Sequence, residues 1–86
     1  DAKNEIDIAA LDPEGKNLIL GECKYWKEPV GLNVLRALEA KACDVAWERD
    51  RRKVWYVLFS ISGFSDELRN HAATRDDLLL IDDGGR

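Results

Sequence analysis

Apolar and polar residues alternate near the start of the chain and predict a β-hairpin. The segment "NEIDIAAL", Asn4 to Leu11, alternates as a strand does, and "NLILGECK", Asn17 to Lys24, reads as the returning strand. Between them, "DPEGK" carries the proline, glycine and acidic residues that favour a tight turn. The hydrophobic pattern therefore predicts two antiparallel strands before any helix begins.

The rest of the chain changes between helical and strand patterns. Apolar residues at helical spacing predict a helix within residues 29–49, and "KVWYVLFSI", residues 53–61, reads as a central strand because it is apolar on both faces. Ser65 is the expected N-cap of a second helix that runs to about Thr74. "LLLID", residues 78–82, reads as the last strand. The ββαβαβ order predicts an α/β domain with a mixed sheet and helices on the sheet faces.

The register of the hairpin decides which side chains share a face. With the turn centred between Glu14 and Gly15, Leu11 faces Leu18 and directly opposed residues lie on the same side of the sheet. One face then carries only apolar residues and is expected to be the core, namely Ile6, Ile8, Ala10, Ile19, Gly21 and Cys23. The other face is apolar near the turn and charged at its far end, where it carries Glu5, Asp7, Glu22 and Lys24.

The charged end of the hairpin contains the candidate chemistry. Asp7 and Glu22 are expected to lie opposite each other, where two carboxylates repel unless one takes up a proton or a cation bridges them. Two carboxylates plus water suit Mg²⁺, and Lys24 on the same face can orient or deprotonate a water or neutralise a phosphoryl oxygen. A solvated hairpin face with a cross-strand ion pair explains the same residues. The residues alone leave both interpretations open.

The segments "EID" and "GECK" resemble the motif of the PD-(D/E)XK, or restriction-endonuclease-like, nuclease superfamily. Asp7 stands at the position of the motif's aspartate, and Glu22-Cys23-Lys24 stands at the position of E-x-K. The segments "ECKYW" and "GFSDEL" are most similar to the domain at the C-terminus of archaeal-type AAA-like ATPases, and the chain also resembles Mrr-like restriction domains. The resemblance extends over nearly the whole sequence.

The resemblance implies a fold, an activity and a set of site residues. It implies a restriction-endonuclease-like fold, whose usual N-terminal helix lies upstream of residues 1–86, and metal-dependent hydrolysis of DNA. Asp7 and Glu22 would bind Mg²⁺ or Mn²⁺, and Lys24 would complete the catalytic set. It also implies that residues 1–86 are one domain of a larger protein with an ATP-binding ATPase domain upstream. The alternative is a catalytically silent accessory or oligomerisation domain of such an ATPase.

Composition narrows the function classes that remain. The chain has 13 basic and 17 acidic residues and a net charge of −4, which argues against tight DNA binding without a metal. The sequence contains no long apolar run for a membrane span, and its two cysteines lack metal-type spacing. We therefore expect a cytoplasmic protein with no membrane association. A small core is compatible with a homodimer, and the sequence leaves the oligomeric state open.

Several polar and aromatic residues are weaker candidates for nucleic-acid contact. Tyr25 follows the motif directly and is able to stack on a base, although aromatic residues at a strand end more often cover a core edge. The other candidates are Asn33, Arg36, Arg51 and Arg52. Exposure to solvent on the protein surface is sufficient to explain Asn33 and Arg36, each taken alone. The basic cluster "ERDRRK" also suits the C-terminus of a helix, where positive charges complement the helix dipole.

Overall fold

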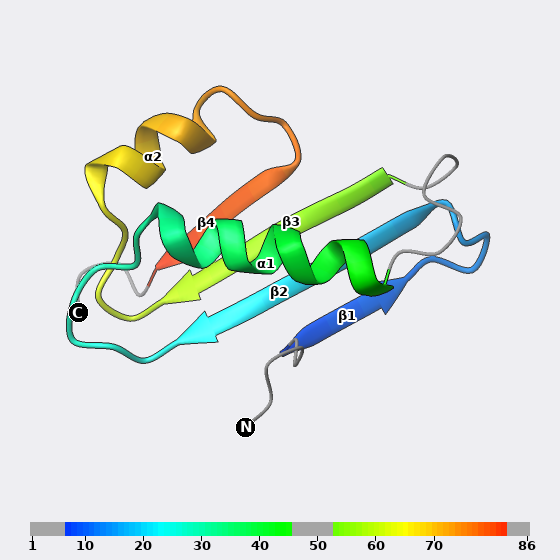
Figure 1. The fold of residues 1–86 in the computed structure, drawn as a ribbon, viewed down its shortest axis with the longest axis horizontal. Helices are drawn as coiled ribbons and strands as arrows, with labels where there is room; N and C mark the ends of the chain where they lie inside the picture. Colours follow the sequence, from blue (N-terminus) through cyan, green and yellow to red (C-terminus); the bar gives the residue numbers. More distant parts are fainter. Residues whose placement is uncertain (1–6, 46–52, 83–86) are drawn as a thin grey trace.

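The computed structural model describes residues 7–45 and 53–82, which form four strands and two helices (Figure 1). In chain order these are β1 (Ile8–Leu11), β2 (Asn17–Lys24), α1 (Leu32–Val45), β3 (Lys53–Ser60), α2 (Asp66–Ala72) and β4 (Leu78–Asp82). The sheet order is β1-β2-β3-β4, with β1 antiparallel to β2 and the other pairs parallel. The prediction of an α/β domain with a mixed sheet is confirmed.

The predicted register of the hairpin is also confirmed. Leu11 pairs with Leu18, and Ile8 pairs with Gly21 at the other end of β1. In the turn, Gly15 has φ of 73°, a left-handed conformation that a side chain would strain. β1 is shorter than the predicted strand, because Asp7 precedes it and residues 4–6 lie outside the described residues.

Both helices pack against the same face of the sheet. The helical spacing of α1 turns its apolar stripe toward β2 and β3, and α2 contributes Leu68 to the same buried cluster. This core consists of Leu18, Leu20, Val30, Val34, Leu35, Leu38, Ala42, Leu58, Phe64 and Leu68. As predicted, Ser65 caps α2, and its hydroxyl accepts a hydrogen bond from the Leu68 amide at 3.1 Å. We call this side of the sheet the closed face.

The prediction of which hairpin face forms the core is wrong. On the face expected to be buried, Ile8 and Ile19 are 36% and 39% exposed, whereas Leu20 on the opposite face is fully buried. Ile6, which was assigned to the same face, lies outside the described residues. α1 packs on the face that carries Leu18, Leu20 and Glu22, so the charged end of the hairpin adjoins the core.

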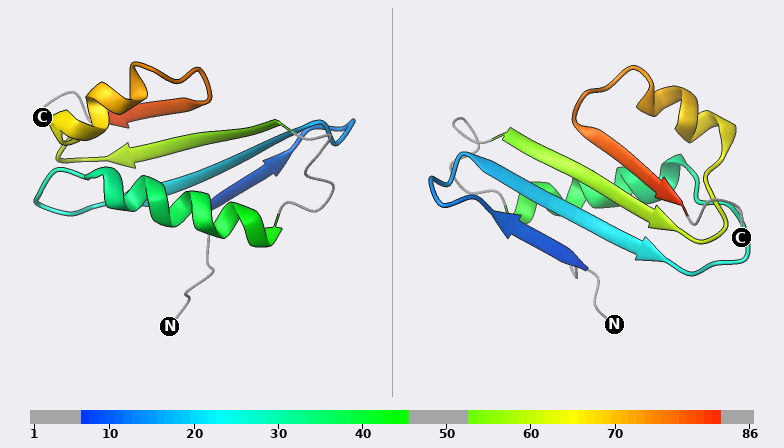
Figure 2. Two further views of the ribbon diagram at one scale, coloured as in Figure 1. Left: turned by 45° about the horizontal axis from the view of Figure 1, so that its top comes forward. Right: turned by 180° about the vertical axis from the view of Figure 1, so that it is seen from behind.

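The opposite side of the sheet carries no helix among the described residues. Seen from behind, the four strands lie in front of α1 (Figure 2). Cross-strand partners place a set of apolar side chains on this side, which we call the open face: Ile8, Ile19, Trp55, Val57, Phe59 and Leu79. Leu79 is 55% exposed. Helices therefore cover one face of the described sheet, and not both as predicted.

Neither helix in the described part of the chain is long and apolar enough to cross a membrane.

Adjacent residues of β2 test which face is the core. We expect Leu20→Ala to lower the free energy of unfolding by about 2–5 kcal/mol, because it opens a cavity under α1. We expect Ile19→Ala to cost only about 1 kcal/mol, mostly through lost β-propensity on the open face. Urea denaturation of both variants measures the difference. A larger loss for Ile19→Ala would contradict the assignment of the core.

Candidate functional site

Glu22 is a buried carboxylate on the closed face, near the C-terminal end of β2. Only 5% of its surface is exposed, because α1 packs over this part of the sheet. Its Oε1 accepts a hydrogen bond from Lys41 Nζ at 2.8 Å, and its Oε2 lies 3.8 Å from Lys24 Nζ. A buried carboxylate needs such partners, since an uncompensated one costs several kcal/mol.

Lys24 belongs to the same strand as Glu22 and lies one strand repeat further along. Its ammonium is 3.8 Å from the Glu22 carboxylate and 5.0 Å from the centre of the Trp26 ring. About a quarter of the Lys24 side chain, 28%, stays exposed. The strand thus holds a lysine with solvent access beside a buried carboxylate, as the E-x-K spacing requires.

The Asp7 side chain contacts the E-x-K segment at the backbone of β2. Its Oδ2 accepts a hydrogen bond from the amide of Cys23 at 2.8 Å. Cys23 is the residue between Glu22 and Lys24, so the Asp7 carboxylate binds the centre of the E-x-K segment. Asp7 precedes β1 by one residue, and the confirmed register of the hairpin brings it to this end of β2.

Lys41 was not predicted as a site residue. It lies on α1 three residues after the buried Leu38 and one before the buried Ala42, and its side chain is 19% exposed. A lysine at this helical spacing interrupts the apolar stripe of α1. That interruption was the one signal in the sequence for a charged group facing the sheet. Glu22, on the sheet beneath, accepts a hydrogen bond from this lysine.

The donor chemistry of Asp7 and Glu22 fits a divalent cation with oxygen ligands. Mg²⁺ binds through one or two carboxylates and keeps several waters, so two carboxylates are sufficient protein ligands. Within residues 7–45 and 53–82, no group of three or more His, Cys, Asp or Glu residues could hold a metal ion. The cation would therefore depend on these two carboxylates together with water and substrate oxygens.

A cavity of about 310 Å³ opens beside Lys24 at the C-terminal ends of the strands. It is lined by Cys23, Lys24, Tyr25, Phe59, Ser60, Ile61 and Asp82. Tyr25 is 76% exposed, so its ring does not cover the core edge as an ordinary strand-end aromatic would. The ring lies at the wall of a hollow that borders the E-x-K segment.

The remaining candidates for nucleic-acid contact are spread over the surface. Asn33 is exposed in the first turn of α1. The Arg36 side chain is 58% exposed, and its guanidinium donates to Glu39 Oε1 at 3.4 Å. Arg51 and Arg52 lie outside the described residues. Tyr25 lines the same cavity as its sequence neighbour Lys24, whereas Arg36 has a partner on its own helix.

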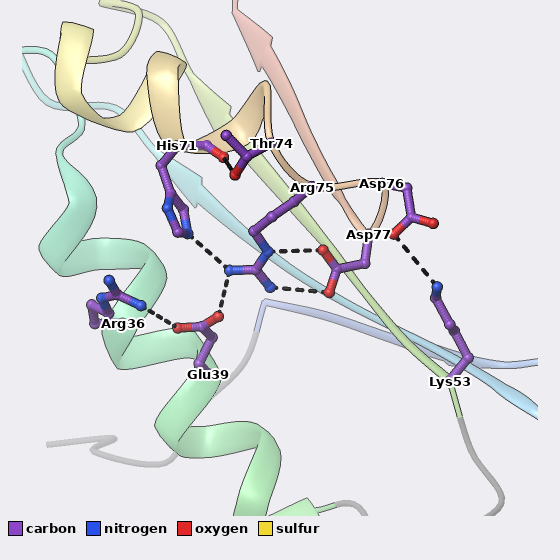
Figure 3. Close-up of polar contacts among 8 residues, drawn as sticks. All are labelled: Arg36, Glu39, Lys53, His71, Thr74, Arg75, Asp76 and Asp77. Atoms are coloured by element: carbon purple, nitrogen blue, oxygen red, sulfur yellow. Dashed lines mark hydrogen bonds and ion pairs between the residues drawn. The ribbon is translucent and has the colours of Figure 1, made fainter.

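A second charged cluster joins α1 to the segment before β4, as Figure 3 shows. The Arg75 guanidinium donates two hydrogen bonds to Asp77, at 2.9 and 3.0 Å, and one to Glu39 of α1 at 2.7 Å. His71 Nε2 lies 3.1 Å from the same guanidinium. These contacts raise the pKa of Arg75, mainly through the hydrogen bonds to Asp77, and they lower the pKa of the Asp77 carboxyl. The cluster fixes α1 against the sheet.

Comparisons with protein-family models, with curated proteins and with solved structures find no match for this chain. The resemblance to the PD-(D/E)XK superfamily therefore stays a prediction from the sequence motif.

The Arg75 cluster predicts a defined dependence of stability on pH. Because the folded state lowers the pKa of Asp77, the pair stabilises the fold well above pH 3.8, the ordinary value. This contribution is lost as pH falls through the lowered folded-state pKa. We expect Asp77→Asn to cost about 1 kcal/mol at pH 7 and progressively less as pH falls below 3.8.

The neighbouring Asp76→Asn variant is the matched control, because the Asp76 side chain is 87% exposed and pairs with Lys53 at 3.6 Å. Urea denaturation across pH 2–8 measures all three proteins. Asp12, whose pKa is lowered mainly by the Asn17 side chain, is present in all three proteins, so its effect on the pH dependence cancels in the comparison. An Asp77→Asn deficit that is the same at both ends of the pH range would contradict the prediction.

Proposed function

We propose that the chain is a PD-(D/E)XK-type nuclease domain that hydrolyses phosphodiester bonds of DNA with Mg²⁺ or Mn²⁺. The observation that carries the proposal is the hydrogen bond from the Cys23 amide to the Asp7 carboxylate at 2.8 Å. It ties the motif's aspartate to the backbone between Glu22 and Lys24. The proposal includes the restriction-endonuclease-like fold and an ATPase domain upstream of these residues.

Each residue of the motif has a role that its chemistry supports. The carboxylates of Asp7 and Glu22 would hold the cation, which when bound supplies positive charge to the phosphoryl oxygens of the transition state. Lys24 would orient the attacking water and add a second positive charge beside the reacting phosphate. Its side chain is 28% exposed, which gives it access to solvent and substrate.

The surroundings of Lys24 favour a nucleic acid as the substrate. A DNA strand that brings its phosphate to Lys24 would pass Tyr25, whose side chain is exposed and lines the neighbouring cavity. Stacking of bases on exposed aromatic rings is a common mode of single-strand binding. Asn33, Arg36, Arg51 and Arg52 remain proposed contacts to the DNA backbone.

Cleavage of plasmid and linear DNA tests the proposed activity directly. We expect the wild-type protein to cleave only with Mg²⁺ or Mn²⁺, and Lys24→Ala and Asp7→Ala to lower the rate about 100-fold or more. Lys53→Ala is the matched control, because it removes an exposed lysine from the other end of the sheet. Absence of metal-dependent cleavage, or equal cleavage by all four proteins, would contradict the proposal.

A catalytically silent accessory or oligomerisation domain is the second candidate function. The observation that favours it is the open face, where Ile19, Phe59 and Leu79 are 39%, 39% and 55% exposed. Strands that are apolar on both sides normally have both sides covered, and contiguous exposed apolar patches mark interaction sites. The occupant we assign to this face is a second copy of the chain, whose matching face carries the same uncharged apolar residues.

Sedimentation velocity over a range of protein concentrations tests this second candidate. We expect reversible self-association that Leu79→Lys on the open face reduces at least tenfold. Asn70→Lys, on the exposed side of α2, makes a lysine at the opposite side of the domain and should leave association unchanged. A monomer at all concentrations, or equal association of both variants, would contradict the assignment of this face.

A further inference from the structure

We propose that Lys41 is a built-in competitor of the divalent cation at Glu22. Its ammonium neutralises the buried carboxylate, and a metal ion must displace or repel it to bind. The inference deepens the proposed function, because it assumes that Glu22 is a metal ligand. It assigns to α1 a residue that sets how readily the site takes up metal.

The distances single out Lys41 as the main partner of Glu22. Its Nζ is 2.8 Å from Oε1, a short charge-assisted hydrogen bond, whereas Lys24 Nζ is 3.8 Å from Oε2. The two lysines therefore belong to different elements, and the interaction of Lys41 with Glu22 is the stronger one. Lys41 satisfies the carboxylate, and Lys24 approaches it loosely and keeps more of its side chain exposed.

Burial explains why a competitor is needed. Glu22 is 5% exposed, so its charge must be compensated even when no metal ion is bound. A cation supplied by the chain itself does this at every metal concentration. The fold is then stable without metal, unlike sites in which carboxylates alone surround the ion and repel one another when it leaves.

Charge explains why the two cations compete. A Mg²⁺ ligand atom lies about 2.0–2.1 Å from the metal ion, so an ion bound to Glu22 would lie within a few ångströms of Lys41. Screening by water is weak at a buried carboxylate, and like charges at that separation repel strongly. Removing the charge of Lys41 must therefore strengthen metal binding, provided that Glu22 keeps its position.

Direct measurement of Mn²⁺ binding tests the inference without relying on catalysis. Electron paramagnetic resonance of free Mn²⁺ gives the Kd for the wild-type protein and for Lys41→Met, Lys41→Gln and Lys41→Arg. We expect Kd to fall at least tenfold in Lys41→Met and Lys41→Gln. Lys41→Arg retains the charge and should bind within threefold of wild type, as should the control Lys53→Met, which removes a lysine distant from Glu22.

The two uncharged variants separate charge from packing. The glutamine amide can still donate to Oε1, so Lys41→Gln keeps a partner for Glu22 if Lys41→Met fails to fold, which circular dichroism would reveal. If Lys41 were only structural, its loss would loosen Glu22 and weaken Mn²⁺ binding. Unchanged or weaker binding in the uncharged variants would thus overturn the inference.

Glu22→Gln distinguishes failure of the inference from failure of the proposed function. If wild-type binding of Mn²⁺ is lost in Glu22→Gln, yet the Lys41 variants bind no more tightly, the metal site stands and the competitor role is wrong. If neither the wild-type protein nor any Lys41 variant binds Mn²⁺ through Glu22, both the metal site and the competitor role are wrong.

Discussion

The ion pair between Glu22 and Lys41 is the interaction on which the site depends. Burial of Glu22 under α1 places a carboxylate where solvent cannot compensate its charge, and Lys41 supplies that charge from the helix at 2.8 Å. The pair therefore couples the packing of α1 on β2 to the electrostatics of the E-x-K segment. Any shift of the helix along the sheet would change the charge balance at Glu22.

The Arg75 cluster contributes to this coupling from the other side of α1. Glu39, which accepts from Arg75 at 2.7 Å, precedes Lys41 by two residues on the same helix. Because Asp77 holds the same guanidinium through two hydrogen bonds, α1 is tied to the start of β4. The side chains that orient α1 and the lysine that reaches Glu22 thus belong to one short stretch of helix.

The sequence was informative where structure follows local rules. Turn residues and strand alternation predicted the hairpin register, and the cap at Ser65 followed from its side chain and the acidic residues after it. The core face was predicted wrongly, because both faces of the hairpin near the turn are apolar. Alternation alone gives no information on which face a helix will cover. Only the long-range packing of α1 decides between Ile19 and Leu20.

The dependence on long-range packing also explains why only part of the candidate site was predicted. Asp7, Glu22 and Lys24 follow from the motif and the register, which are local properties of one hairpin. Lys41 lies 19 residues from Glu22 along the chain and meets it only through tertiary packing. A lysine within an apolar helical stripe indicates a buried acidic partner without identifying it. The exposure of the open face was not predicted either, because strands that are apolar on both sides predict a sheet with both faces covered.

Anomalous diffraction from crystals of this chain grown with saturating Mn²⁺ tests the central claim most directly. The account predicts one peak at coordination distance from carboxylate oxygens of both Asp7 and Glu22, with Lys41 no longer hydrogen-bonded to Oε1. Lack of a peak at these residues, with Lys41 still hydrogen-bonded to Glu22 Oε1, would contradict it.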